Sequence, residues 1–170
     1  MNIQLPRIAS VGTAEPTTLE IVWTDGTADR VDLAGWIATG GPMLGALQDT
    51  ALFRQARVGE YGAAVEWGDD DDLALDAQHA RLLALAQRPF TAADIAAWQE
   101  AMNLSNREAA DFFQTAVSTW SSYKAGAPIP ARISMLCRAA ERDPILMQAY
   151  YRPRKTGRPK GVSGQAMSGE

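Results

Sequence analysis

Residues 104–126 read LSNREAADFFQTAVSTWSSYKAG, and this stretch decides the fold of the second half of the chain. Ser105 and Glu108 have the spacing of a capping box, in which each side chain accepts a hydrogen bond from the backbone N–H of the other residue. The box predicts a helix that begins at residue 106 and ends at a short break at residues 114–115. The side chains that this helix would bury are Ala109, Phe112 and Phe113.

A second short helix is predicted directly after that break, over residues 117–124. Trp120 and Tyr123 stand three residues apart, the spacing that places two side chains on one face of a helix. Gly126 can end this helix, because glycine adopts the left-handed conformation at little steric cost. Two short helices joined by a tight turn are typical of domains that place a helix in the major groove of DNA.

Three further helices are expected around this pair. The first follows Thr91 and carries apolar residues at helical spacing, namely Ile95, Trp98 and Met102. Pro130 suits the first turn of the next, whose apolar face would hold Ile133, Leu136, Cys137 and Ala140. Asp143-Pro144 marks the start of the last. We therefore predict an all-α helix-turn-helix domain of about five helices over residues 91–151.

Residues 104–126 resemble, without a gap, the helix-turn-helix of the lambda-repressor-like (Cro/cI-type) family. The positions that match its usual residue types are Leu104, Ser105, Glu108, Ala110, Phe113, Thr119, Ser121 and Gly126. The chain departs from the family at Gln114, where glycine is usual, and at Ala116, where serine or threonine is usual. The resemblance implies that duplex DNA is the partner. The alternative is a helix-turn-helix retained for protein contacts alone.

The resemblance also indicates which residues would contact DNA. The base-reading positions fall on Val117, Ser118 and Ser122, with Thr119 beside them. None is Arg, Asn or Gln, the side chains that make bidentate contacts with bases, so we expect low sequence specificity. Phosphate contacts, which set register and affinity, are expected from Asn106, Arg107, Lys124 and Arg132.

The residues after Pro153 contain no periodic apolar positions, and we expect a disordered basic tail over residues 152–170. The sequence RKTGRPKG at residues 154–161 resembles an AT-hook, although Thr156 stands in place of the first core arginine. The tail residues predicted to contact DNA are Arg154, Lys155, Arg158 and Lys160. A basic strand favours a narrow minor groove of high negative potential. The alternative is a tail that only solubilises the protein.

The first half of the chain has the pattern of a small α+β domain. Alternating residues predict strands at 7–13, 18–23 and 27–31, with a hairpin turn at Asp25-Gly26. Asp32 is expected to cap a short helix, and a second hairpin is expected around residues 59–62. Residues 76–87 look helical, and Pro89 breaks that helix. We place a domain at residues 1–77 and a linker or helix at 78–90.

This half resembles the bacterial family catalogued as domain of unknown function 2442. The resemblance rests on WTDG at 23–26, VDL at 31–33, LQD at 47–49, LF at 52–53, VEW at 65–67 and DLALD at 72–76. Members are small α+β domains with no known catalytic residues. Some occur alone, beside genes for small toxin-like proteins, which implies an antitoxin role. Others carry a C-terminal helix-turn-helix.

Composition excludes several other classes of protein. Residues 1–80 carry a charge of −9 and residues 81–170 a charge of +5, which suggests a polyanion partner for the second half. Cys137 and His79 are the only residues of their types, so neither a disulfide nor a usual zinc site is expected. The acidic run at 69–72 lacks the alternation of a calcium loop. No run of 18 apolar residues and no secretory signal are present, which predicts a cytoplasmic protein.

These observations lead to one functional hypothesis and one alternative. The hypothesis is a homodimeric bacterial transcriptional regulator that binds duplex DNA through its helix-turn-helix. Its N-terminal domain would bind a protein or a small ligand, and the protein would have no catalytic residue, no cofactor and no metal. The alternative is a protein-interaction module, such as an antitoxin, in which the helix-turn-helix is secondary. An enzyme is not expected, because the first half offers no nucleophile beside a base.

Overall fold

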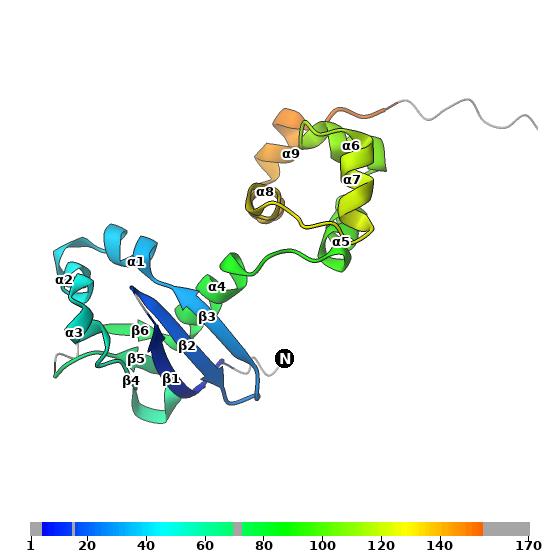
Figure 1. Ribbon diagram of the computed structural model, residues 1–170. Helices are drawn as coiled ribbons and strands as arrows, with labels where there is room; N and C mark the ends of the chain where they lie inside the picture. Colours follow the sequence, from blue (N-terminus) through cyan, green and yellow to red (C-terminus); the bar gives the residue numbers. More distant parts are fainter. Residues whose placement is uncertain (1–4, 15, 70–72, 155–170) are drawn as a thin grey trace, which may run out of the picture. The chain divides into compact units, whose positions relative to one another are not determined.

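The computed structural model describes residues 5–14, 16–69 and 73–154 (Figure 1). The chain is mixed α/β and divides into two compact units, Met1–Arg88 and Pro89–Glu170. The first unit contains small antiparallel sheets and helices, and the second contains helices in its described part. In the described part of the chain, each helix is too short or too polar to cross a membrane.

Strands β1 (Ile8–Ala14), β2 (Thr18–Trp23) and β3 (Ala28–Asp32) form an antiparallel sheet in that order. The predicted hairpin between β2 and β3 is confirmed: Gly26 has a φ of +85°, and Asp25 Oδ1 accepts a hydrogen bond of 2.8 Å from the Thr27 N–H. Glycine allows the positive φ, and the aspartate satisfies a backbone donor of the turn.

The second sheet has the order β4 (Arg57–Val58), β5 (Ala64–Glu66) and β6 (Ala74–Asp76). The hairpin between β4 and β5 was predicted, whereas β6 was not. The 3-10 turn η2 (Glu60–Gly62) connects β4 and β5 and lies against β1. Gly62 has a φ of +68°, and a Cβ atom there would lie 2.4 Å from the Ile8 carbonyl oxygen. Only glycine therefore fits this close approach between the turn and β1.

Short helices connect the two sheets, and a longer helix ends the unit. They are α1 (Ala34–Thr39), α2 (Gly41–Gly45), α3 (Thr50–Phe53) and α4 (Ala77–Gln87), with the 3-10 turn η1 (Ala46–Gln48) between α2 and α3. Asp32 was expected to precede the first helical residue directly, but α1 begins one residue later. The Asp32 Oδ1 atom still accepts a hydrogen bond of 2.8 Å from the Ala34 N–H.

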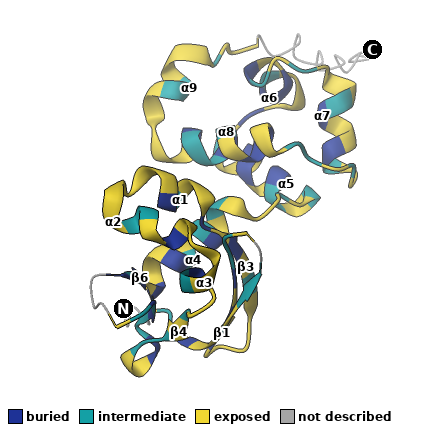
Figure 2. Ribbon diagram, turned by 60° about the vertical axis from the view of Figure 1, so that its left-hand side comes forward, coloured by how far each residue is buried: buried dark blue, intermediate teal, exposed yellow. Residues whose placement is uncertain are grey.

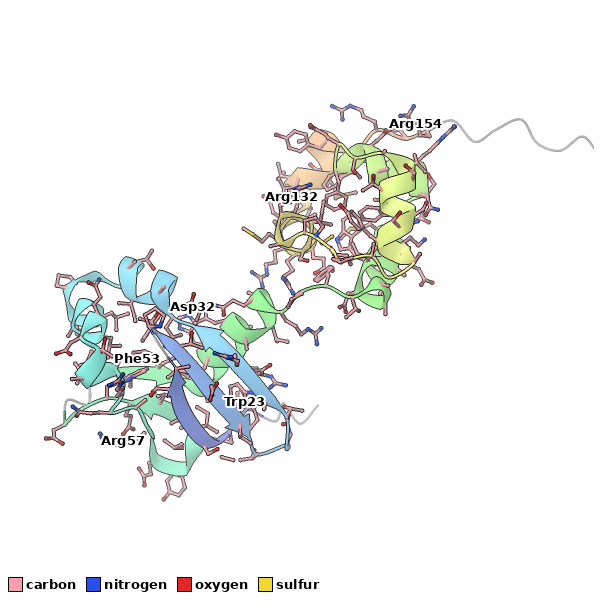
Figure 3. All side chains as sticks on the ribbon, in the orientation of Figure 1. Trp23, Asp32, Phe53, Arg57, Arg132 and Arg154 are labelled. Atoms are coloured by element: carbon pink, nitrogen blue, oxygen red, sulfur yellow. The ribbon has the colours of Figure 1, made fainter. Side chains whose placement is uncertain are left out.

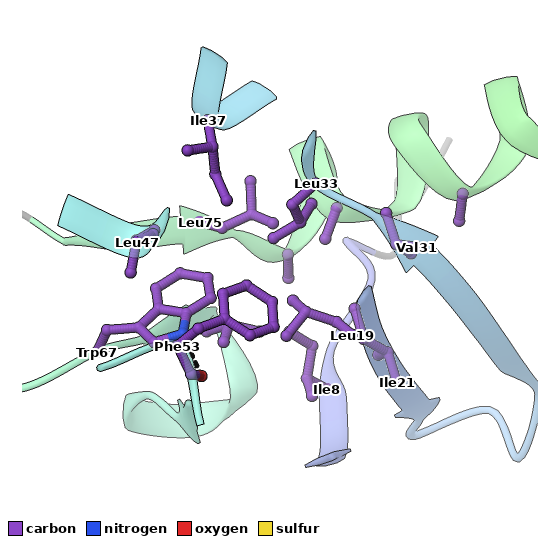
Figure 4. Close-up of a cluster of buried hydrophobic side chains, with 14 of the residues drawn as sticks. Ile8, Leu19, Ile21, Val31, Leu33, Ile37, Leu47, Phe53, Trp67 and Leu75 are labelled. Atoms are coloured by element: carbon purple, nitrogen blue, oxygen red, sulfur yellow. Dashed lines mark hydrogen bonds between the residues drawn. The ribbon is translucent and has the colours of Figure 1, made fainter. Parts of the chain in front are cut away.

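The core of the first unit is built around Trp67 and Phe53 (Figure 4). Their ring centroids are 5.9 Å apart, and the Trp67 indole N–H donates to the Phe53 carbonyl oxygen at 3.0 Å. The surrounding apolar side chains include Leu19, Leu33, Leu47 and Leu75, each fully buried. The indole donor thus finds a partner within the core, as a buried tryptophan requires.

Helix α4 belongs to this core, which corrects the expected domain boundary. Ala77, Ala80 and Ala84 are buried in it, and the Gln87 side chain binds β3 through both of its polar atoms. Gln87 Oε1 accepts from the Asp32 N–H at 2.9 Å, and Gln87 Nε2 donates to the Asp32 carbonyl oxygen at 2.7 Å. The helix predicted at residues 76–87 is therefore part of the first unit, which extends to Arg88 instead of ending at residue 77.

The helices of the second unit are α5 (Ala92–Ala101), α6 (Asn106–Phe112), α7 (Val117–Lys124), α8 (Ala131–Arg142) and α9 (Pro144–Tyr150). The predicted capping box of Ser105 and Glu108 is confirmed, and Thr91 forms a second one with Asp94. Asp143 caps α9, with Pro144 in its first turn. Each of these start signals is local in sequence, which explains why the helices were predictable.

Aromatic side chains fill the core of the second unit. Trp120 is fully buried, and its ring stacks on Phe113 with centroids 5.0 Å apart and planes inclined by 12°. Trp98 packs against Phe113 at 5.1 Å and donates its indole N–H to the Cys137 carbonyl oxygen at 3.1 Å. Helices α5, α6 and α7 are thus held together by packed rings, and Trp98 links them to α8.

Candidate nucleic-acid interface

Helix α7 has one buried face and one exposed face. Trp120 and Tyr123 are buried, as predicted, while Val117, Ser118, Ser121 and Ser122 are exposed. Figure 2 shows this change between buried and exposed positions along the helix. Thr119, which was predicted to contact DNA, is half-buried. The exposed face is therefore made of small, neutral side chains.

The charge on α7 favours a polyanion as binding partner over a polycation. Its eight residues include no Asp or Glu, and its last residue is Lys124. The Ser122 hydroxyl donates to the Ser118 carbonyl oxygen at 2.9 Å, a bond that leaves the oxygen of that hydroxyl free to accept. A DNA backbone would therefore meet no acidic side chain of α7.

Lys124 and Asn106 are brought together, although they lie 18 residues apart. The Lys124 ammonium donates to Asn106 Oδ1 at 3.0 Å, which places the end of α7 beside the start of α6. The amide group of Gln99 on α5 also donates to Asn106 Oδ1, at 3.1 Å. Two of the predicted phosphate-contacting residues thus form one polar group on adjoining helices.

Gln99 is a buried polar residue beside this group that was not predicted from the sequence. It is 8% exposed, and all its polar atoms are used: Oε1 accepts from the Trp120 indole at 2.8 Å, and Nε2 donates to the Leu104 carbonyl at 2.9 Å as well as to Asn106. A signal was present, because Gln99 follows Ile95 by four residues and so belongs to the inward face of α5. A polar residue at such a position implies buried hydrogen-bond partners.

The turn between α6 and α7 places Gln114 and Ala116 at positions that favour other residue types. Gln114 has a φ of +51°, a conformation that glycine adopts more easily. Ala116 is the N-cap residue of α7 and has no side chain that can accept a hydrogen bond there. Serine or threonine would satisfy a free N–H of the first turn at this position.

Restoring that cap is expected to stabilise the second unit. Ala116→Ser should raise its free energy of unfolding by about 1 kcal/mol, because the new hydroxyl can accept from a backbone N–H of α7. Urea unfolding followed by circular dichroism measures the change. Ala125→Ser is the control, since Ala125 stands at the other end of α7, where no helix N–H needs a partner. Equal changes in the two variants would show that no cap forms.

The other predicted contact residues are more scattered. Arg107 and Arg132 are exposed, in the first turns of α6 and α8, and among the described residues neither forms an ion pair with the group around Asn106. Arg132 lies on α8, whereas Arg154 lies in the segment that follows α9 (Figure 3). Lys155, Arg158 and Lys160 lie outside the described residues.

Arg154 has an acidic partner that was not predicted. Its Nε atom donates to Asp111 Oδ2 at 2.7 Å, and its terminal nitrogen contacts the same oxygen. Its backbone N–H donates to Glu108 Oε1 at 3.0 Å, and the Tyr151 hydroxyl donates to that atom at 2.9 Å. Together with the Ser105 N–H, these donors lower the pKa of Glu108 to about 2, so this carboxylate stays ionised at neutral pH.

The described residues contain no group of three or more His, Cys, Asp and Glu side chains that could hold a metal ion. Most of the acidic run at 69–72 lies outside them. The Cys137 thiol is buried, and burial raises its pKa to about 12, which makes it a poor nucleophile.

Comparison with known proteins adds little. No family model and no curated protein matches this chain. A crystal structure from Nitrosomonas europaea ATCC 19718, of a protein named as a candidate DNA-binding protein, is 22% identical to it. The match covers 96% of this chain and 100% of that one, with a TM-score of 0.44. So low a score does not establish a common fold.

Proposed function

We propose that the second unit is a lambda-repressor-like helix-turn-helix domain that binds duplex DNA, with α7 in the major groove. The observation that carries the proposal is the exposed face of α7, which is small, uncharged and free of acidic side chains. The major groove of DNA admits an α-helix, and small side chains let the helix backbone approach the bases closely. Val117, Ser118 and Ser122 meet that condition.

In this arrangement most of the affinity comes from phosphates. Lys124 and Arg107 supply cations next to the first turn of α6, and Asn106 orients Lys124. Serine hydroxyls bond to any base, and the methyl groups of Val117 can contact a thymine methyl. The protein therefore discriminates weakly between sequences and holds the DNA backbone firmly.

Ser118→Asp is expected to weaken DNA binding about 10-fold or more, because it places a carboxylate on the face that approaches the phosphates. Ser118 is the second residue of α7, where an acidic side chain favours the helix dipole, so the variant should fold as well as the wild type. Fluorescence anisotropy of a labelled duplex measures the affinity, and circular dichroism checks the fold.

Gln78→Glu is the matched control. Gln78 is exposed at the second position of α4 in the first unit, and the change adds one negative charge in the same helical context. We expect its affinity for DNA to stay within about twofold of the wild-type value at moderate salt, since the change leaves every side chain of the second unit as it is. Equal weakening by both variants would contradict a contact through α7.

For the first unit we propose a protein partner, in keeping with its resemblance to domain of unknown function 2442. One cavity, lined by Leu5, Arg7, Ala63 and Gln78 among others, has a volume of about 100 Å³. Pockets for small molecules are typically about 300–1,000 Å³. This cavity is too small for such a ligand. The whole protein is then a dimeric transcriptional regulator in which both units bind and neither catalyses a reaction.

A further inference from the structure

The residues after α9 lie on the surface of α6. Tyr151 and Arg154 contact Glu108 and Asp111, which precede them by about 40 residues in the sequence. Three kinds of contact are present: a side-chain hydroxyl on a carboxylate, a backbone N–H on the same carboxylate, and a guanidinium on a second carboxylate. We call residues 151–154 the strap.

The strap is held by several contacts that act together, and one of them is an exposed ion pair between Arg154 and Asp111. Glu108 Oε1 accepts from both the Tyr151 hydroxyl and the Arg154 backbone N–H, and hydrogen bonds to a charged group are about twice as strong as neutral ones. Tyr151 is half-buried and packs against the aromatic core of the second unit, so its ring is fixed as well as its hydroxyl. Glu108 is itself fixed, because it closes the capping box of α6. The strap therefore contacts a rigid part of α6.

Two neighbouring arginines of the strap differ in their partners. Arg152 donates to the carbonyl oxygens of Ala149 and Tyr151, at 3.0 and 2.8 Å, and has no acidic partner among the described residues. The charge of Arg154 is neutralised by Asp111. Arg154 is thus suited to anchoring the chain, whereas Arg152 keeps its charge for another partner.

We propose that the strap ties the start of the basic tail to α6, and that Tyr151 and Arg154 are positioning residues for DNA binding. The cations beyond the strap are Lys155, Arg158 and Lys160. Arg154, which directly precedes Lys155, contacts α6, and α6 packs directly on α7. This inference rests on the proposed function, and it gives Arg154 an anchoring role in place of the expected contact with DNA.

The advantage of the strap would be a higher effective concentration of the tail cations near the bound DNA. A basic segment that starts next to the DNA-contacting helix meets phosphates as soon as that helix binds, whereas one that starts from a free chain end samples a larger volume. The strap adds no contact with DNA. It acts by limiting where the three tail cations can be.

The test breaks the strap without changing the net charge. In the variant Tyr151→Phe/Asp111→Asn/Arg154→Gln, one negative and one positive charge are lost together, and the Tyr151 ring stays in place. We expect DNA binding by the full chain to weaken about 3- to 10-fold. The same three changes in a chain that ends at Arg154 should have no effect, because the tail that the strap positions is gone.

The control is Glu20→Gln/Arg30→Gln, which removes an exposed ion pair of 3.6 Å from the first unit and also leaves the net charge unchanged. It should bind DNA like the wild type. If the strap variant binds as tightly as the wild type, or weakens the full and shortened chains equally, the inference is overturned while the proposed function stands. Absence of DNA binding by the wild type overturns both.

Discussion

Trp120→Ala is expected to lower the free energy of unfolding of the second unit by about 3–5 kcal/mol, the cost of removing a buried aromatic side chain. Trp120 is fully buried and packs against rings from α5 and α6. Its removal leaves a cavity between three helices and deprives the buried Gln99 Oε1 atom of its hydrogen-bond donor. Both effects lower the free energy of unfolding of the second unit.

The unfolding of each unit can be followed separately in one experiment. In a urea titration followed by NMR, the indole N–H signal of Trp98 reports the second unit and that of Trp67 the first. In Trp120→Ala, we expect the urea concentration at the midpoint of the Trp98 transition to fall and that of the Trp67 transition to stay unchanged. Val117→Ala is the control on the same helix, because Val117 is 40% exposed and should cost less than about 1 kcal/mol. A loss below about 1 kcal/mol for Trp120→Ala would contradict its place in the core.

Trp120→Phe separates packing from hydrogen bonding. The ring stacking on Phe113 is largely kept, but the Gln99 oxygen loses its donor, which should cost about 1–3 kcal/mol. The difference between the two variants then measures what the ring contributes beyond its N–H. If Trp120→Phe costs nothing, the Gln99 side chain has another partner and does not depend on α7.

The second unit was more predictable from the sequence than the first, because its signals are local. Capping residues and apolar spacing lie within single helices, so Ser105 and Glu108 indicate the start of α6 without reference to the rest of the chain. In the first unit, Trp67, Leu33 and Leu75 meet in one core from distant segments. Strand β6 has only three residues and exists through its pairing with β5, which a local pattern does not reveal.

The residues of the candidate interface also differ in how far the sequence predicted them. Val117, Ser118 and Ser122 were selected through the resemblance to a known family, and the structure exposes all three. The partners of Arg154 were not predicted, because Asp111 lies 43 residues away and is reached only after α8 and α9 have folded back. The buried role of Gln99 likewise depends on three helices. Local sequence patterns predict the helices and strands and which of their faces are exposed. Tertiary contacts determine which charged side chains have a partner of opposite charge.

Removing the tail should have the largest effect on DNA binding. A chain that ends at Arg154 lacks Lys155, Arg158 and Lys160. Because each neutralised phosphate contributes about 0.9 to the slope of log affinity against log salt, the slope should become shallower by up to about 3. Binding to every sequence should weaken at low salt, and A·T-rich duplexes should be affected most.

A shorter deletion provides the control. Residues 161–170 contain no Lys or Arg, so a chain that ends at Lys160 keeps all the tail cations. Its slope should equal that of the full chain. If both shortened chains keep the full slope, the tail does not touch DNA, and affinity must come from the helices alone.

The full chain in the same titration tests the central claim most directly. Anisotropy of a labelled duplex is recorded against protein concentration at several salt concentrations. The proposal predicts saturable binding at low salt and a linear fall of log affinity with log salt, with a slope that corresponds to several phosphates. Absence of binding at the lowest salt, with the protein folded by circular dichroism, would contradict DNA binding and favour a protein-interaction module.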